Sequence, residues 1–285
     1  MQSIWMITAS LLFACMGVCV KLGSAQFSAG ELVFYRGFIS LLLVYGYMRV
    51  AGLAPATRHW RTHLTRSIFG FVSLVMYFFS ISMISLATAV TLNYTSPLFL
   101  ALLLAFWQRE RIRPLLHLAL LAGFVGVVLL LRPAWHSEQL AGGLFGLGSG
   151  ILSSIAYLNV RTLGELGEPE WRTVFYFSLI SAIGGLPWAL AAQPFHAIDT
   201  HGWLLLLGVG GFGALAQLCM TRAYKQGKTM VVASFAYTTV IFSSLFGFWL
   251  WDERLSLPAV LGICLIIASG VLATAFSRFA PVEQD

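Results

Sequence analysis

Hydrophobic residues in this chain gather into runs of roughly 20, the length that crosses about 30 Å of hydrocarbon as a helix. Backbone groups in lipid must satisfy their own hydrogen bonds, so each run is expected to be helical. The pattern predicts an all-α membrane protein with ten transmembrane helices, which cover residues 3–22, 30–49, 66–84, 87–107, 114–132, 142–163, 172–192, 203–223, 230–251 and 257–277.

The second half of the chain repeats the first about 143 positions later. The run Tyr-Thr-Ser at 94–96, for example, coincides at this offset with the run Tyr-Thr-Thr at 237–239. Each copy holds five predicted helices, and an odd number makes the two copies cross the membrane in opposite directions. We therefore predict two inverted five-helix repeats, residues 1–133 and 141–279, related by a pseudo-two-fold axis in the membrane plane.

Composition agrees with a membrane protein: 59% of residues are hydrophobic and 10% are charged, against roughly 25% charged residues in soluble domains. The net charge of +6 could suggest nucleic acid, but the placement of the charges indicates topology instead. Lys21, Arg132 and Arg254 lie on one side of the membrane and Arg36 lies within a span. The remaining 13 of the 17 Lys and Arg residues lie on the side of the two termini. By the positive-inside rule both termini are cytoplasmic, and the lipid bilayer rather than nucleic acid is the expected partner.

Arg36 is the strongest candidate for a solute-binding residue. If the second helix starts near Ser28, Arg36 lies about 12 Å along it, and an arginine facing lipid there would cost at least about 2.5 kcal/mol. It is therefore expected to face the bundle interior or a cavity. Two roles remain open: a counter-charge for an anionic or zwitterionic solute, or a structural arginine bonded to helix-end carbonyls.

Glu31 lies at the start of the same helix. The sequence Ser28-Ala-Gly-Glu31 fits a capping box, in which the two side chains satisfy the first free N–H groups of the helix. A pairing with Arg36 or Lys21, or a role in proton transfer, is the alternative.

Polar residues also gather in the middle of the fourth span and at the matching place in the ninth. Pro97 removes a backbone donor and tends to kink the helix ahead of it, which frees carbonyls near the membrane midplane. A lone Ser or Thr usually just bonds its own backbone, but the coincidence of two runs at one repeat position favours a solute site. The predicted solute-binding residues from these runs are Asn93, Tyr94, Ser96, Tyr237 and Thr238.

Tyr77, Tyr157, Asn159 and Gln217 are further polar residues inside predicted spans. Each can hydrogen-bond a small solute, and each can equally serve a bond between helices. Of these we assign Tyr77, Tyr157 and Gln217 to the walls of the predicted site.

Several kinds of chemistry leave no trace in the sequence. It holds no nucleotide-binding loop, no His-Glu-x-x-His and no Gly-x-Ser-x-Gly, so we predict no catalytic residues and no cofactor. Cys15 and Cys19 share a helix face but lack further ligands, so no metal site is predicted. No carboxylate lies in the middle of a span, which argues against lipophilic cations as substrates.

A spaced set of residues runs through nearly the whole chain: Ser96-Pro97-Leu98-Phe99, Glu110-Arg111, Gly126-Val127, Leu131-Arg132-Pro133, Ala233, Tyr237, Gly247, Glu253, Gly262 and Gly270. With this set the chain resembles the EamA-like family of the drug/metabolite transporter superfamily. The resemblance implies a central cavity lined chiefly by spans one, three, four, six, eight and nine. It also implies substrates as different as amino acids, other metabolites, nucleotide sugars and drugs, so the fold does not give the substrate.

Together these features predict a secondary transporter of small polar metabolites, such as amino acids or their derivatives, in the bacterial inner membrane. The expected mechanism is alternating access around a site at the midplane. A multidrug exporter is the alternative, because 14% of the residues are aromatic, and a membrane scaffold without transport is a further one. The sequence leaves the oligomeric state open, and a monomer is compatible with it.

Overall fold

The computed structural model describes residues 4–107, 118, 121–123, 125–127, 129, 137–192, 195–226, 232, 235–253 and 255–276. These residues form helices and connections, and no strand occurs among them, which confirms the all-α prediction for this part of the chain. In chain order the helices are α1 (Ile4–Gly23), α2 (Ala29–Val50), α3 (Trp60–Met83), α4 (Leu86–Asn93), α5 (Ser96–Trp107), α7 (Ser137–Glu165), α8 (Glu170–Ala192), α9 (Thr200–Gln226), α11 (Thr238–Trp251) and α12 (Leu257–Phe276).

Six of the described helices, α1, α2, α3, α7, α8 and α9, are long and apolar enough to cross a membrane. They match six predicted spans, with the largest difference at α3, which begins at Trp60 rather than at residue 66. The predicted span 87–107 is divided between α4 and α5. The predicted span 114–132 and the first part of 230–251 lie mostly outside the described residues.

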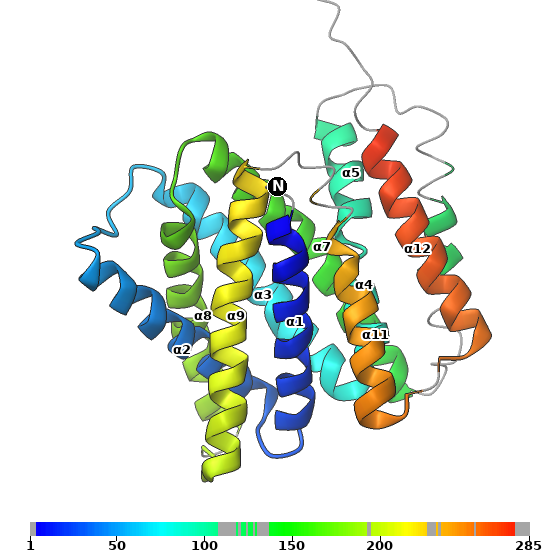
Figure 1. The fold of residues 1–285 in the computed structure, drawn as a ribbon, viewed down its shortest axis with the longest axis horizontal. Coiled ribbons are helices and arrows are strands. Elements are labelled where there is room, and N and C mark those ends of the chain that lie inside the picture. Colours follow the sequence, from blue (N-terminus) through cyan, green and yellow to red (C-terminus); the bar gives the residue numbers. More distant parts are fainter. Residues whose placement is uncertain are drawn as a thin grey trace, which may run out of the picture.

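Helices from the two halves of the chain interleave (Figure 1). In the bundle α1 packs on α9 and α11, α2 packs on α8 and α9, and α3 packs on α7 and α8. The contact between the two halves therefore forms the centre of the molecule. The beginning of α1 and the end of α12 lie at the same end of the bundle (Figure 1).

The capping box predicted at the start of α2 is present. The backbone N–H of Glu31 donates to the Ser28 hydroxyl over 3.3 Å, and the Glu31 carboxylate accepts from the Ser28 N–H over 2.8 Å. The same carboxylate also accepts from the backbone and ring nitrogens of His196, each over 2.8 Å. Glu31 thus joins the start of α2 to the segment before α9, and its partners among the described residues include neither Arg36 nor Lys21.

The polar runs of the two halves coincide with two helix breaks. The helix of α4 ends at Asn93, residues 94 and 95 form a turn, and α5 starts at Ser96, just before the proline of this run. In the second half a turn at Tyr237 precedes α11, although Val240 replaces the proline there.

Equivalent threonines close both breaks. The Thr95 hydroxyl donates to the carbonyl of Leu92 over 2.7 Å, and the Thr238 hydroxyl donates to the carbonyl of Phe235 over 2.6 Å. Each hydroxyl thus bonds back to the carbonyl three residues earlier at its helix break, and the two bonds are 143 positions apart.

Gly150 allows α7 to approach the first break closely. A methyl group on Gly150 would lie 2.6 Å from the Thr95 hydroxyl and 2.7 Å from the carbonyl oxygen of Leu92. No larger residue fits there without displacing the turn. The close approach places the polar side chains of α7 beside those of the break.

Large apolar side chains cover the outside of the bundle. Leu42 and Leu43 on α2, Leu204 and Leu207 on α9 and Trp249 on α11 are each more than half exposed. Many large apolar side chains exposed to this extent are unusual on soluble monomers, whereas lipid solvates them. Together with the long apolar helices they identify a multi-pass membrane protein.

A cluster of polar groups ties the connection between α2 and α3 to the start of α8. Glu168 accepts hydrogen bonds from the Thr57 hydroxyl and, over 2.8 Å, from the Arg172 guanidinium, and the His63 ring nitrogen lies 3.3 Å away. Burial alone would raise the pKa of the Glu168 carboxyl, but these hydrogen bonds lower it below its usual value. Glu168 is therefore ionised in the folded protein at neutral pH.

Replacing Glu168 with glutamine should lower the free energy of unfolding at neutral pH by about 1–3 kcal/mol, the usual cost of removing one partner of a buried hydrogen bond. A lowered pKa stabilises the fold above the unfolded value of about 4.3, and the stabilisation disappears as the pH falls through the folded value. Apparent unfolding temperatures in detergent should therefore differ at neutral pH and converge as the pH falls through the lowered pKa of Glu168. A difference that stays constant across this range would contradict the assignment.

Candidate functional site

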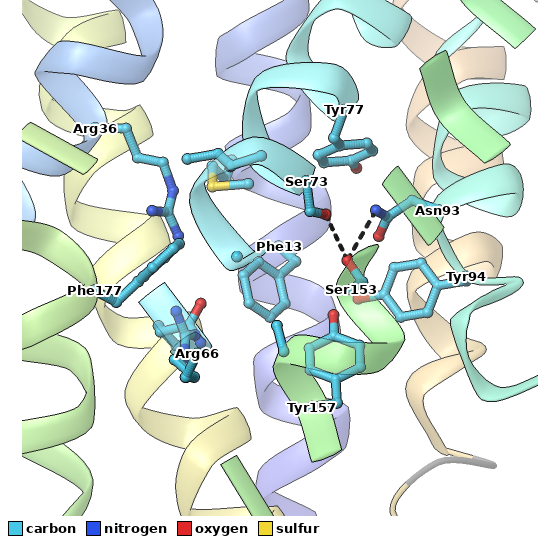
Figure 2. Close-up of a pocket in the computed structure, with 15 residues that line it drawn as sticks. Phe13, Arg36, Arg66, Ser73, Tyr77, Asn93, Tyr94, Ser153, Tyr157 and Phe177 are labelled. Carbon is cyan, nitrogen blue, oxygen red and sulfur yellow. Dashed lines mark hydrogen bonds between the residues drawn. The ribbon is translucent and has the colours of Figure 1, made fainter. Parts of the chain in front are cut away.

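A cavity of about 70 Å³ lies inside the bundle, among α1, α2, α3, α4, α7, α8 and α9 (Figure 2). Five of these helices, α1, α3, α4, α7 and α9, correspond to spans one, three, four, six and eight, which the family resemblance placed around a central cavity. The structure adds α2 and α8, and no described residue of span nine lines the cavity.

Six of the nine predicted site residues line this cavity: Arg36, Tyr77, Asn93, Tyr94, Tyr157 and Gln217. The other three, Ser96, Tyr237 and Thr238, are not among the described residues of its wall. Ser96 and Tyr237 are buried at the starts of α5 and α11, and the Thr238 hydroxyl is bonded to the Phe235 carbonyl. The described residues at the break of span nine therefore pack around the site and do not line the cavity in this conformation.

Arg66 is the main site residue that the sequence prediction missed. Hydropathy placed it at the membrane surface, at the start of a span beginning at residue 66. The structure instead starts α3 at Trp60, which puts Arg66 about 9 Å inside the helix at 1.5 Å per residue. Its side chain is 2% exposed and lines the cavity.

Arg36 and Arg66 both point at the ring of Phe177 on α8 (Figure 2). The guanidinium carbon lies 4.8 Å from the ring centroid for Arg36 and 3.8 Å for Arg66. The two guanidinium carbons are thus no more than about 8.6 Å apart, the sum of these distances. At this separation two positive charges repel each other by roughly 2 kcal/mol in a medium of effective dielectric constant 20.

No counter-charge offsets this repulsion among the described residues that line the cavity, since none of them is Asp or Glu. The Nε and Nη1 atoms of both arginines are buried and have no hydrogen-bond partner in the described part of the chain. Buried charges are normally paired, because the desolvation of an unpaired charge costs several kcal/mol. The contacts with Phe177 stabilise the two guanidinium groups in part and leave their donors free.

Neutral polar groups form the opposite wall, contributed by α3, α4 and α7 (Figure 2). The Ser73 and Ser153 hydroxyls are 2.7 Å apart, and the Asn93 side-chain N–H donates to Ser149 over 2.9 Å and to Ser153 over 3.4 Å. Tyr77 and Tyr157 complete this wall. The cavity therefore has a cationic side and a hydrogen-bonding side.

The cavity is small in this conformation. Sites that enclose drug-sized ligands measure about 300–1,000 Å³, whereas this cavity has room for only a few water molecules. The cavity in this conformation is therefore smaller than such ligand sites.

An ion pair joins the two halves of the chain near one end of the bundle. The Lys21 ammonium at the end of α1 lies 3.4 Å from the Glu253 carboxylate and donates to the carbonyl of Ile84 over 2.6 Å. The same carboxylate accepts from the backbone N–H of Leu86 at the start of α4, over 3.4 Å. The pair thus connects α1, the start of α4 and the end of α11.

Within the described residues no group of three or more His, Cys, Asp or Glu side chains could hold a metal ion. The four cysteines form no disulfide there. Cys15, Cys19 and Cys219 are partly buried and Cys264 is exposed. The site is thus built from guanidinium, hydroxyl, amide and aromatic groups. These groups can bind and orient a polar solute, and they offer no arrangement of nucleophile and base.

A helical membrane bundle that encloses a polar, positively charged cavity has the architecture of a solute transporter. Comparison with known proteins agrees. The model of the EamA-like transporter family matches residues 1–132 and 140–275, and the chain belongs to this family, within the drug/metabolite transporter superfamily.

Two bacterial relatives illustrate the range of the family. The pseudopaline exporter CntI of Pseudomonas aeruginosa is 31% identical over 265 residues, which cover 92% of each chain. A riboflavin transporter of Vibrio cholerae is 25% identical over 269 residues, which cover 91% of this chain and 89% of the relative. One solved crystal structure has the same fold, with a TM-score of 0.72 at 20% identity over 97% of this chain and 98% of the other.

Proposed function

We propose that this protein is a secondary transporter of the bacterial inner membrane for small polar metabolites that are anionic or zwitterionic, with amino acids or their derivatives as the first candidates. Both termini lie in the cytoplasm in this proposal. The observation that carries it is the buried guanidinium of Arg36, which lines the cavity without a carboxylate partner in the described residues. A negatively charged group of the solute supplies the missing partner.

The proposed mechanism is alternating access by two inverted five-helix repeats, residues 1–133 and 141–279. Three observations support the repeats: the family model matches the chain twice, the helix breaks at 94 and 237 are equivalent, and the threonines beside them make the same bond. The packing of the helices agrees, because the contact of α1 with α9 has its counterpart in that of α7 with α3. The two repeats rock about the cavity, and solute stabilises the state that closes over it.

The ion pair of Lys21 and Glu253 fits a gate in this mechanism. It joins the two repeats at the end of the bundle that the charge distribution places outside the cytoplasm. Closure of that end keeps the cavity contracted, and separation of the pair accompanies its opening to the periplasm.

A multidrug exporter is the second function to weigh, because Phe13, Tyr94 and Phe177 give the cavity aromatic walls. Many exported drugs are lipophilic cations, however, and Arg36 and Arg66 would repel a cation from this cavity. The relatives named for pseudopaline and riboflavin also handle defined metabolites. A scaffold without transport would have no use for two unpaired buried charges.

Counterflow in proteoliposomes tests the proposed function. Vesicles are loaded in turn with amino acids, organic acids and quaternary ammonium dyes, and uptake of the labelled form of each is followed with and without a proton gradient. We expect exchange of anionic or zwitterionic metabolites and none of the dyes. Exchange of the dyes, with no response to any amino acid or organic acid, would reject the proposal.

A further inference from the structure

We infer that the transported solute carries two anionic groups, one that binds Arg36 and one that binds Arg66. It also carries a neutral hydrogen-bonding group that faces the opposite wall of the cavity, at α4. This inference rests on the proposed function and specifies the substrate class of the same cavity. It depends on Arg66, which doubles the positive charge of the site (Figure 2).

The geometry does not support a purely structural role for these arginines. A structural arginine deep in a membrane helix would bond to carbonyl groups at helix ends. The Nε and Nη1 donors of both arginines are instead buried without a hydrogen-bond partner among the described residues. Each arginine therefore keeps donors available for a ligand.

The buried carboxylates of the protein show the opposite arrangement. Glu31 accepts hydrogen bonds from Ser28 and His196, and Glu168 accepts them from Thr57 and Arg172. Both acids are thus satisfied by groups of the protein itself. These two buried carboxylates have partners within the described residues, so the free donors of the cavity arginines indicate a partner from outside.

Two anionic groups balance the charge of the site better than one. Both guanidinium groups contact the ring of Phe177, at 4.8 Å and 3.8 Å from its centroid, so two positive charges lie beside one ring. A single carboxylate that forms a bidentate pair with one arginine leaves the other uncompensated. A solute with two carboxylates on a short carbon chain neutralises both at once.

Two glycines leave room for this arrangement. A methyl group on Gly70 would lie 2.9 Å from Nη1 of Arg66, and one on Gly213 would lie 3.3 Å from Nε of Arg36. Side chains at these positions would crowd the two guanidinium groups. Their absence keeps the free donors within reach of a solute.

The opposite wall defines the rest of the solute. Asn93, Ser73 and Ser153 bond to one another over 2.7–3.4 Å and carry no charge. They suit an amino, hydroxyl or amide group at the other end of the molecule. An acidic amino acid or a hydroxylated diacid combines these features.

Three matched pairs of compounds test the inference by counterflow in proteoliposomes: aspartate and asparagine, glutamate and glutamine, and succinate and succinamate. The members of each pair have nearly the same shape and differ by one carboxylate. We expect the compound with two carboxylates to exchange at least tenfold faster in at least one pair, because only this compound occupies both arginines.

Variants of Arg66 link this preference to the site. Arg66→Gln should reduce the ratio within that pair to near one, and Arg66→Lys, which keeps the charge but loses the planar fork, should retain part of it. Arg61→Gln is the matched control, because Arg61 is exposed one turn earlier on the same helix. A preference that survives in Arg66→Gln would overturn the assignment of Arg66.

The outcomes separate this inference from the proposed function. Equal exchange of both members of every pair in the wild type would overturn the requirement for two anionic groups and leave a transporter of zwitterions. Exchange of none of the six compounds would also overturn it, whatever other metabolites are carried. Transport of quaternary ammonium dyes alone would overturn both.

Discussion

Replacing Arg36 with glutamine should reduce the transport of anionic solutes by about 30-fold or more, while the apparent unfolding temperature stays unchanged or rises. Truncation of one partner of a buried charge pair typically costs about 2–5 kcal/mol of binding, and each 1.4 kcal/mol is a factor of ten. In the empty protein the substitution gives up the contact with Phe177, but it also removes a buried charge that is repelled by Arg66 and loses no described hydrogen bond of Nε or Nη1. Counterflow and thermal unfolding of the same preparation measure both effects.

Arg49→Gln is the matched control for this prediction. Arg49 lies on the same helix, α2, but it is exposed in the last turn. Its replacement should leave counterflow within about a factor of two of the wild type, since exposed charges contribute little. A loss of stability in Arg36→Gln as large as its loss of transport would identify Arg36 as a structural arginine and contradict the proposed function.

Gly37→Ala should destabilise the protein strongly and reduce the yield of folded transporter. A methyl group on Gly37 would lie 2.6 Å from the backbone nitrogen of Ala182 and 2.8 Å from the backbone carbonyl carbon of Ser181. Backbone atoms cannot rotate away as a side chain can, so α2 and α8 must separate at their contact. Overpacking of this kind costs about 1–3 kcal/mol or more. The separation would also move Arg36, the preceding residue, relative to Phe177 on α8.

Gly46→Ala on the same helix provides the comparison. Beyond the backbone of its own helix turn, no described atom lies within 4 Å of a methyl group built on Gly46, so this substitution should be neutral or should stabilise α2 by up to about 1 kcal/mol. Yield after purification and apparent unfolding temperature in detergent report both variants. Equal stability of the two would show that α2 and α8 are not packed as closely as described.

Much of the fold could be predicted from the sequence because lipid imposes simple rules. Runs of apolar residues have to form helices, and the six long described helices match their predicted spans within about six residues. The capping box at Ser28 and the break before Pro97 follow from local chemistry, and both are present. The break at Tyr237 was not predicted, because no proline marks it and the deviation depends on packing.

The lining of the candidate cavity was predicted in part. Single polar residues deep in spans, such as Arg36 and Asn93, stand out because they are costly in lipid. Arg66 was assigned to the surface, because hydropathy treats the polar residues 60–65 as a connection although they form the first turns of α3. Helical periodicity could have revealed it: residues 66, 70, 73 and 77 recur at intervals of three and four, and all line the cavity.

Thr238 is the opposite case, a residue that was predicted to bind the solute but is not among the described residues of the cavity wall. Its repeat position beside Tyr237 suggested a solute ligand, but a threonine at a helix break can equally bond the backbone. The structure places its hydroxyl on the Phe235 carbonyl. Which of the two roles a hydroxyl takes depends on the local break, which the residue types alone do not specify.

The positively charged cavity inside the bundle should receive its solute from water. Ser153→Cys provides the test, in a background without Cys15, Cys19, Cys219 and Cys264, because Ser153 lies on the cavity wall opposite the arginines. Two membrane-impermeant methanethiosulfonate reagents of similar size, one anionic and one cationic, are compared in proteoliposomes. We expect faster labelling by the anionic reagent, and protection by the anion that exchanges best in counterflow. Absence of labelling by both reagents, or faster labelling by the cationic one, would contradict it.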